Sequence, residues 1–291
     1  MSPPDQPGPA VHNRYAEEDE PDGPELGLGA ALRSLADREA LRAAPALLRE
    51  RGWWGGLLLV ILLSVVFVLL GEWQWHRHEA KLLRRDVVTV NYDTAPVPLR
   101  SVLPRPDSPL PPDRQWMPVR ASGRYQAGRS LLVRNRPLDE QTGYEQLVPL
   151  RLADGSVLVV DRGWLPAGRT GAAPDAVPPI PSGPVTVLVR LRPGEPASDR
   201  QAPSGQVQRI DLAAVARLSG EPVQPAYGVL AEETPPPGTA PTPLPRPDVD
   251  LGPHLSYTMQ WWGFALAAYL IWAALLVREA QRRLAARREG P

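Results

Sequence analysis

Two long uncharged stretches stand out in the hydrophobic pattern of the chain. Residues 52–71 hold 20 consecutive uncharged positions, most of them Leu, Val or Gly, and residues 255–277 hold 23. A helix rises about 1.5 Å per residue, so either stretch can cross the roughly 30 Å hydrocarbon core of a bilayer. We predict transmembrane helices over residues 52–75 and 254–277. The first run starts too far into the chain, and is too long, for a cleaved signal peptide.

Between these helices the pattern changes to short β-branched or alternating runs separated by Pro and Gly. The clearest is a hairpin whose Asp154-Gly155 pair suits the positive φ angles of a tight turn. Asp211 is placed to cap a short helix over residues 211–218. The middle, residues 76–253, is therefore predicted to be a mainly-β domain with Pro-rich loops, a small antiparallel barrel or sandwich with one short helix. The predicted strands are residues 87–90, 117–125, 130–134, 145–152, 157–164, 185–191 and 227–230.

The two ends of the chain are polar and differ in charge. Residues 1–25 are rich in Pro and acidic side chains, and we predict that they are disordered. Residues 26–51 have helical periodicity with a break at Pro45. This fits a cytoplasmic juxtamembrane helix, either lying on the membrane surface or forming a short soluble helix. Residues 278–291 form a basic tail.

The placement of arginine predicts the orientation of the two helices. Five arginines follow the second hydrophobic stretch, whereas the 20 residues before His254 contain only Arg246. Because basic residues favour the cytoplasmic side, we expect the second helix to end in the cytoplasm. Two helices then place both termini in the cytoplasm and residues 76–253 outside it. The basic residues that flank the first helix agree weakly with this orientation.

Composition argues against several classes of function. The 32 basic and 32 acidic residues balance, so net charge indicates no nucleic-acid partner. The chain has no cysteine, which removes disulfides, thiol catalysis and thiolate metal sites. Residues 79–253 contain no histidine, nucleophile elbow, phosphate loop or zinc-protease motif, so we do not expect an enzyme. Catalysis by carboxylates alone stays open.

Three histidines flank the hydrophobic helices. His76 and His78 are about 200° apart on a helix and cannot both face one ligand, so no metal site is predicted. His254 opens the second helix, and Tyr257 and Trp261 share its face. Imidazole is a common axial ligand of haem iron, and aromatic walls suit a flat ring. For His76 and His78, an ordinary interfacial position is the simpler interpretation.

The first helix continues into a polar face. Gln74, Arg77, His78 and Lys81 are spaced so that they share one side of a helix, and Trp73 is placed as a membrane-interface residue. Such a face forms a basic collar at the membrane surface or binds carboxylates, such as the propionates of a haem. Spacing alone does not separate these two readings, and we favour the collar.

Five motifs follow one another along the chain. Those of the middle domain have a simple structural interpretation, in which Asp161 pairs with an arginine and Trp164 closes one end of a barrel. Together, and bracketed by two hydrophobic helices, the set resembles the Surfeit locus protein 1 (Shy1-like) family of cytochrome c oxidase assembly factors. The motifs are Leu70-Gly71-x-Trp73-Gln74-x-x-Arg77-x-x-x-Lys81, Arg134-Asn135-Arg136-Pro137, Gly143-Tyr144 with Val148-Pro149-Leu150, Asp161-Arg162-Gly163-Trp164, and His254-Leu255-x-Tyr257-x-x-Gln260-Trp261.

The resemblance implies an assembly factor for haem-copper cytochrome c oxidase. Such a factor helps to insert haem A into subunit I or stabilises that subunit. Its partners would be subunit I, other oxidase assembly factors and the lipid bilayer. In this chain His254 matches the family histidine that is the candidate contact of a transiently bound haem A. Tyr257 and Trp261 would wall the ring, and Arg77 and Lys81 would meet its propionates.

Other matched motif positions carry no assigned chemical role. The chain departs from the family where Gly252-Pro253 precedes His254, since many members have asparagines there. The acidic N-terminus and the use of Arg in place of Lys favour a bacterial plasma membrane as the location of the protein.

The alternative function is a membrane-anchored envelope scaffold or sensor that binds a partner through its β-domain without haem. The motif positions without a role are Trp73, Gln74, Arg134, Asn135, Gly143, Tyr144, Asp161, Arg162, Gly163 and Trp164.

Overall fold

The computed structural model describes residues 37–290. These residues divide into a helical unit, built from residues 37–75 and 254–290, and a barrel unit, His76–Pro253. The predicted disordered tail, residues 1–25, and the first part of the predicted juxtamembrane helix lie outside the described residues. The elements are α2 (Arg38–Leu47), α3 (Arg51–Asn91), β1 (Val97–Pro98), α4 (Leu99–Val102), η1 (Pro112–Arg114), β2 (Pro118–Tyr125), η2 (Ala127–Arg129), β3 (Leu131–Leu138), β4 (Gln141–Leu152), β5 (Val157–Pro166), β6 (Pro184–Pro193), β7 (Gln206–Val207), α5 (Leu212–Ser219), β8 (Val223–Thr234) and α6 (His254–Glu289).

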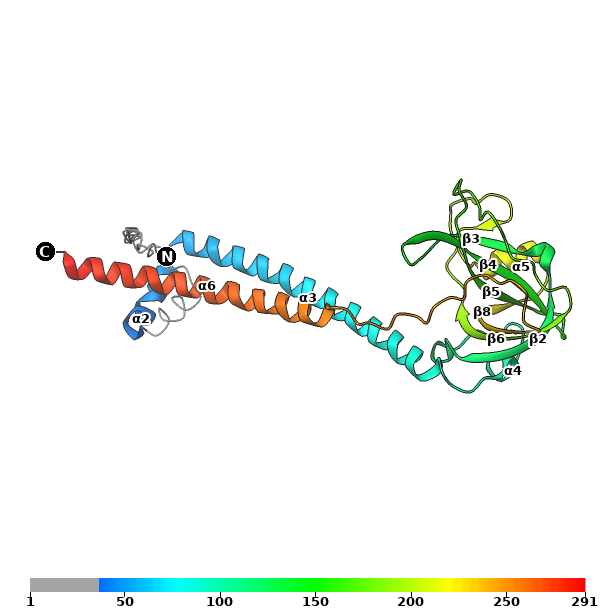
Figure 1. The fold of residues 1–291 in the computed structure, drawn as a ribbon. Helices are drawn as coiled ribbons and strands as arrows, with labels where there is room; N and C mark the ends of the chain where they lie inside the picture. Colours follow the sequence, from blue (N-terminus) through cyan, green and yellow to red (C-terminus); the bar gives the residue numbers. More distant parts are fainter. Residues whose placement is uncertain (1–36, 291) are drawn as a thin grey trace, which may run out of the picture. The chain divides into compact units, whose positions relative to one another are not determined.

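In the helical unit, α3 and α6 pack side by side in opposite directions (Figure 1). Both are long and apolar enough to cross a membrane. Small residues of α3 mark the line of contact. Gly56 lies beneath the indole of Trp272, and Ser64 donates a hydrogen bond to the carbonyl of Ala265 at 3.3 Å. Small residues let the two helix backbones approach closely, as in helix pairs of membranes.

Both helices extend beyond the predicted hydrophobic spans. α6 continues through the basic residues to Glu289, and α3 continues into the barrel unit as far as Asn91. The predicted strand over residues 87–90 is therefore wrong. Extending an existing helix over valine costs only a few tenths of a kcal/mol per residue, and burial of Val88 favours it.

α2 packs on the basic end of α6, which the sequence pattern did not indicate. Ala40, Ala44 and Leu47 of α2 form a small core with residues of α6 that include Val277 and Ala280. Asp37 caps α2 by accepting hydrogen bonds from the backbone of Glu39 and Ala40, and it also accepts one from Gln281 of α6 at 3.1 Å. The sequence predicted a helix break at Pro45, but α2 includes this proline and ends at Leu47. The fixed φ of proline is itself helical, so the residue can lie inside the last turn.

The barrel unit contains a closed five-stranded barrel, the first of the two forms that the sequence left open. The strands follow the order β2-β6-β8-β5-β4, and β4 pairs back with β2 to close the ring. β3 and β7 extend the sheet beyond β4, and β1 extends it beyond β2. Within the closed ring, one pair departs from the predicted antiparallel arrangement, since β5 and β8 run parallel. The connection between them passes through β6 and α5, which gives the chain the length to return in the same direction. The two short strands β1 and β7 also pair in parallel, with β2 and β3 respectively.

The alternation of side chains explains the two cores of this unit. Even-numbered residues of β5, Leu158 and Val160, point into the barrel together with alternate residues of the other strands. Val159 points outward and is covered by α5 through Leu212 and Val215. β5 is therefore buried on both faces, which accounts for its continuous run of apolar residues.

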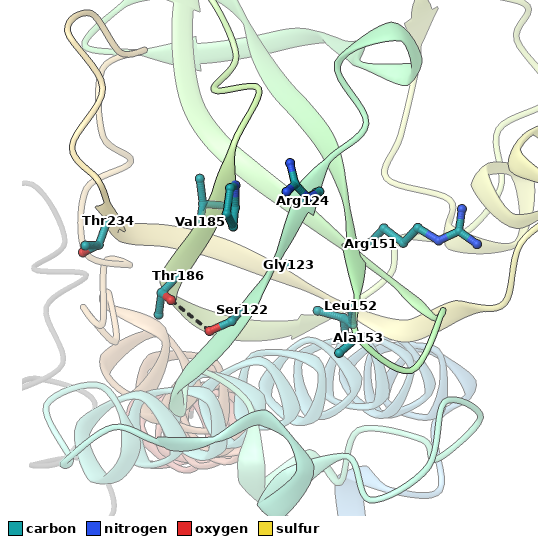
Figure 2. Close-up of a pocket in the computed structure, with 10 residues that line it drawn as sticks. Ser122, Gly123, Arg124, Arg151, Leu152, Ala153, Val185, Thr186 and Thr234 are labelled. Carbon is teal, nitrogen blue, oxygen red and sulfur yellow. Dashed lines mark hydrogen bonds between the residues drawn. The ribbon is translucent and has the colours of Figure 1, made fainter.

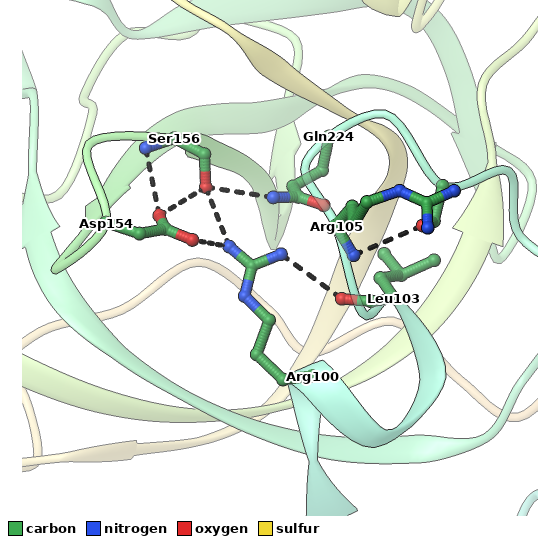
Figure 3. A network of polar contacts seen from close by, with 7 residues as sticks. Arg100, Leu103, Arg105, Asp154, Ser156 and Gln224 are labelled. Carbon is green, nitrogen blue, oxygen red and sulfur yellow. Dashed lines mark hydrogen bonds and ion pairs between the residues drawn. The ribbon is translucent and has the colours of Figure 1, made fainter.

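The predicted hairpin turn between β4 and β5 is present and is held by a polar network (Figure 3). Gly155 has a φ of 81°, as the Asp-Gly pair predicts. Asp154 accepts hydrogen bonds from the backbone and hydroxyl of Ser156 and pairs with Arg100. The buried Gln224 of β8 donates to the hydroxyl of Ser156 at 2.9 Å, so the network ties the turn to the neighbouring strand.

Closure of the barrel requires a glycine in β2. Gly123 pairs with Leu152 of β4 on one side and with Val185 of β6 on the other. A Cβ atom at this position would overlap the carbonyl oxygen of Arg151. The small residue therefore lets β4 approach β2 where the ring closes.

We predict that Gly123→Ala lowers the free energy of unfolding by about 1–3 kcal/mol, because the added methyl group forces the closing strands apart. Chemical denaturation of the full chain in detergent, followed by tryptophan fluorescence, measures the change. Gly128→Ala is the matched control, since no atom lies within 4 Å of a Cβ there, and it should change stability by about 0.5 kcal/mol or less. Equal stability of the two variants would contradict this account of barrel closure.

Candidate functional site

A histidine–glutamine contact joins the two long helices of the helical unit. Nδ1 of His254, at the start of α6, lies 2.8 Å from Oε1 of Gln74 on α3. An amide oxygen only accepts hydrogen bonds, so Nδ1 carries the hydrogen and donates it. Both residues belong to the sequence motifs, but their spacing along the chain does not predict that they pair.

The neighbouring turns of α6 hold this histidine in place. Thr258 is fully buried, and its hydroxyl donates to the carbonyl of His254 at 3.0 Å and lies 3.5 Å from the carbonyl of Gly71. A Cβ atom at Gly71 would overlap the indole of Trp262, which also stacks on Trp75. The close approach at Gly71 therefore sets the height at which His254 meets α3.

The aromatic residues beside His254 take different positions. Trp261 stacks on Phe67 of α3, with ring centroids 5.7 Å apart, so its side of α6 packs against the first helix. Tyr257 is exposed on the surface of the helical unit. Trp73 is exposed too. Of the two aromatic residues predicted to wall a ring, Tyr257 is therefore exposed and Trp261 is engaged in the helix contact.

The residues predicted to meet the propionates belong to the barrel unit. Arg77 and Lys81 both lie on α3 after its helical-unit part. The ammonium group of Lys81 donates to the carbonyl of Asp250 at 3.4 Å. This contact ties the return segment before α6 to α3 within the barrel unit. A role of Arg77 and Lys81 toward a ligand stays a prediction.

An imidazole oriented by a neighbouring oxygen could hold a metal ion or the iron of a haem. Metal-binding histidines usually donate their other ring N–H to an oxygen that fixes the tautomer and the ring orientation. Gln74 supplies such an oxygen. Among the described residues, no group of three His, Cys, Asp or Glu side chains is placed to hold a bare metal ion.

The Arg-Asn-Arg motif forms a bulge in β3. Asn135 adopts a left-handed φ of 56°, and the pairing with β4 shifts register between Val133 and Arg136. Asparagine tolerates this conformation better than most residues. The two arginines are thereby turned to different partners. Arg134 donates to Gln206 of β7 at 2.6 Å and lies over the ring of Tyr144.

Arg136 binds two acidic side chains outside the barrel. Its guanidinium lies 3.0 Å from Glu145 of β4 and 2.7 Å from Glu195, which follows β6. Burial alone would raise the pKa of Glu195, but hydrogen bonds from Arg136 and from the backbone of Ile210 hold that pKa below its ordinary value. Arg136 therefore joins β3, β4 and the segment before α5.

Two motif glycines make room for the motif tryptophan and for the return segment. A Cβ atom at Gly143 would overlap the ring of Trp164, whose Nε1 donates to the carbonyl of Arg136 at 2.7 Å. Gly163 has a φ of 131°, and a Cβ atom there would overlap the carbonyl of Thr242. Trp164 exchanges two backbone hydrogen bonds with Thr242, so the Pro-rich segment after β8 is fixed to the barrel.

The adjacent residues Asp161 and Arg162 point to opposite faces of β5. Arg162 is buried inside the barrel, where it pairs with Glu233 of β8 at 3.0 Å and donates to Gln146 at 3.2 Å. Its guanidinium also lies over the ring of Tyr125. The sequence predicted that Asp161 pairs with an arginine. Among the described residues, the ion pair of this motif is instead the one between Arg162 and Glu233. Glu233 could not be recognised from sequence, since it lies 71 positions away in a segment without motif.

Asp161 is buried on the outer face of β5. Its carboxylate accepts a hydrogen bond from the backbone of Gly163 at 3.1 Å. Burial raises the pKa of Asp161 well above its ordinary value, and the nearby Glu145 carboxylate adds to the effect. Burial likewise raises the pKa of Glu145. The two carboxyl groups influence each other electrostatically, and Arg136 opposes the rise of both pKa values.

A surface groove lies at the edge of the barrel where β2 meets β6 and β4 (Figure 2). Its volume is about 470 Å³. The hydroxyls of Ser122 and Thr186 share a hydrogen bond of 2.8 Å at its wall. Arg124 and Arg151 are the charged residues among those that line it, and none of the lining residues is a carboxylate or a histidine. The lining of this groove therefore offers no acid–base pair of side chains.

Comparison with known proteins agrees with the motif order. The sequence profile described as the SURF1 family matches residues 61–266. Relatives from Mycobacterium bovis and Mycobacterium tuberculosis, each described as an uncharacterized SURF1-like protein, are 31% identical over 248 residues. These alignments cover 81% of this chain and 90% of each relative. The matched range of the profile includes Gln74, His254 and every strand of the barrel.

We predict that Asp161→Asn flattens the pH dependence of stability. The folded carboxyl group binds its proton more tightly than the unfolded one, whose pKa is about 3.8. Stability from this group is therefore present at acidic pH and is lost as the pH rises through the folded pKa. The amide cannot ionise and still offers an oxygen to Gly163, so the variant should gain stability over the wild type as the pH rises to neutral.

Denaturant midpoints of both proteins, measured from acidic to neutral pH, test this prediction. The difference between the variant and the wild type removes the titration of all other groups. A difference that stays constant across the pH range would contradict a raised pKa of Asp161 in the folded protein.

Proposed function

The chain belongs to the SURF1 family, and we propose that it assists the assembly of haem-copper cytochrome c oxidase. The family is associated with assembly of this oxidase, and its members act as assembly factors rather than enzymes. The proposal rests on the family match and on the motif set that the match encloses.

In finer detail, the proposed role is to hold haem A on its way into subunit I of the oxidase. The observation that carries this role is the hydrogen bond between Nδ1 of His254 and Gln74. It would orient the imidazole in the way that neighbouring oxygens orient metal-binding histidines. Bound haem would supply the iron to which Nε2 coordinates.

The residues of the chain have separate tasks in this proposal. Gln74 positions the imidazole of His254, and Thr258 with Gly71 fixes the height of α6 against α3. Tyr257 offers an exposed aromatic face beside the histidine. Arg77 and Lys81 belong to the barrel unit, and no role toward the ligand is assigned to them.

The proposed location is a bacterial plasma membrane that α3 and α6 both cross. The antiparallel packing of the two apolar helices supports this, because it brings the start of α3 to the end of α6 on one side of the bilayer. The arginines at that end would lie in the cytoplasm.

The proposed partners are subunit I of the oxidase and other assembly factors. In the alternative function, a scaffold without haem, the groove shown in Figure 2 would be the surface that binds the partner.

We predict that His254→Ala lowers the haem A content of the oxidase severalfold, while the amount of the variant in the membrane is unchanged. Gln74→Leu should lower it in the same direction, since the imidazole loses its acceptor. Gln74→Glu keeps an oxygen at this position and should retain function. Reduced-minus-oxidised spectra of membranes from a strain that expresses each variant as its sole copy measure haem A.

His76→Ala serves as a matched control on the same membrane side. This imidazole lies 3.4 Å from Glu79 on one turn of α3 and is not part of the motif set. We expect a much smaller effect. A clear loss with His76→Ala and none with His254→Ala would contradict the assignment, and no effect of either would favour the scaffold function.

The orientation is tested by single cysteines, since the natural chain has none. Ser204→Cys places a thiol on an exposed turn of the barrel unit, and Ala285→Cys places one on the exposed surface of α6 beyond its apolar run. An impermeant thiol reagent added to intact cells should label the first variant and not the second. The reverse labelling would overturn the proposed orientation.

A further inference from the structure

The part of α3 that belongs to the barrel unit carries an apolar stripe. Ala80, Leu83, Val87 and Val90 are spaced by three, four and three residues, so they share one face of the helix. Val87 is half-buried, and the other three residues are exposed. Leu83 and Val90 keep 69% and 70% of their surface accessible. Apolar side chains gathered on one exposed face usually mark a contact with another molecule.

Other faces of the same segment hold it in the barrel unit. Val88 is fully buried, and the side-chain amide of Asn91 donates to the carbonyls of Asp113 and Gln115 at 2.6 and 2.8 Å. α3 is therefore already ordered where the stripe lies. A partner that covers the stripe does not have to induce the helix, which lowers the entropic cost of binding.

The stripe lies too far along α3 for lipid to cover it. The predicted membrane span ends at residue 75, and Leu83 and Val90 follow about 12 and 22 Å further along the helix axis. The headgroup layer of a bilayer extends only about 5–8 Å beyond each face of its hydrocarbon core. If α3 crosses the membrane, these two side chains face either water or another protein.

The charged residues beside the stripe indicate which partner fits. In the heptad notation of coiled coils, abcdefg, the stripe supplies the a and d positions, so Glu79 takes a g position and Arg84 the following e position. Both side chains are exposed. In two parallel helices in register, each g residue faces the next e residue of the other helix. Glu79 of one copy would then face Arg84 of a second copy, and two-fold symmetry forms this pair twice. An antiparallel pair would instead place like charges together.

The membrane imposes the same parallel arrangement. Copies of one chain cross the bilayer in a single orientation, so their α3 helices leave it in the same direction. Valine at an a position with leucine at a d position is typical of two-stranded coiled coils. The charge pattern, the apolar residue types and the shared orientation all fit a second copy of this chain.

We propose that residues 79–90 of α3 pair with the same residues of a second copy in a parallel two-stranded coiled coil. This inference rests on the membrane crossing of α3 given under the proposed function, but not on haem binding or oxidase assembly. A contact of about two heptads is weak on its own. Confinement of both copies to one membrane raises their effective concentration and so favours the dimer.

Cysteine cross-linking in native membranes tests the contact, since the natural chain has no cysteine. Leu83→Cys and Val90→Cys place thiols at d positions, and mild oxidation should convert each variant into a product of twice the mass of the chain. Thr89→Cys is the matched control, because this exposed residue of α3 adjoins Val90 but lies outside the stripe. It should form severalfold less of the dimer.

Charge exchange in the Leu83→Cys background tests the parallel register. Glu79→Arg and Arg84→Glu should each lower the cross-linked fraction severalfold, because like charges then face each other across the dimer. The double variant restores opposite charges and should recover the cross-linked fraction. Both positions are exposed, so the single substitutions should leave the fold intact, and tryptophan fluorescence checks this.

Equal cross-linking of Thr89→Cys and Val90→Cys would overturn the proposal, as would a double variant that shows no recovery. A cross-linked product of another mass would assign the stripe to a different protein and would also overturn it. Because the readout is a covalent dimer, failure here leaves the proposed role in oxidase assembly untouched. The cysteine labelling described above tests the membrane placement separately.

Discussion

The absence of a side chain at Gly71 lets Trp262 enter the contact between α3 and α6. With the indole seated there, the buried Thr258 hydroxyl reaches the carbonyls of both helices. One turn further along α3, Gln74 meets the first residue of α6. The tautomer of His254, and with it the proposed chemistry, depends on this close packing. A larger residue at position 71 would separate the helices and remove the acceptor from the imidazole.

The motif residues of the barrel unit act mainly through structure. Gly143 and Gly163 leave space for Trp164 and for the return segment at Thr242, and Asn135 permits the bulge that directs its neighbouring arginines. Arg162 and Glu233 bring an ion pair into the barrel interior. Removing one partner of such a buried pair costs about 3–5 kcal/mol, because the other charge is left without compensation. Substitutions at these positions should therefore impair function through stability of the barrel.

Local patterns in the sequence predict the parts of this fold that depend on local physics. The uncharged runs predict α3 and α6, and the Asp154-Gly155 turn predicts the β4–β5 hairpin. Pairings between distant segments escaped prediction, because no periodicity encodes them. The contact of Gln74 with His254 joins positions 180 residues apart. The parallel pairing of β5 with β8 and the packing of α2 on α6 likewise depend on tertiary contacts. Residues 87–90 were misassigned because β-branched side chains favour strands only weakly against an established helix.

The central claim is that His254 contacts haem A during transfer to the oxidase. The most direct test is the optical absorption spectrum of the full chain purified in detergent from cells that make haem A. The account predicts a Soret band and haem A absorption in the wild-type protein, and a strong reduction of both in a preparation of His254→Ala at equal protein concentration. Intact wild-type protein without haem absorption, purified from cells that contain haem A, would contradict it.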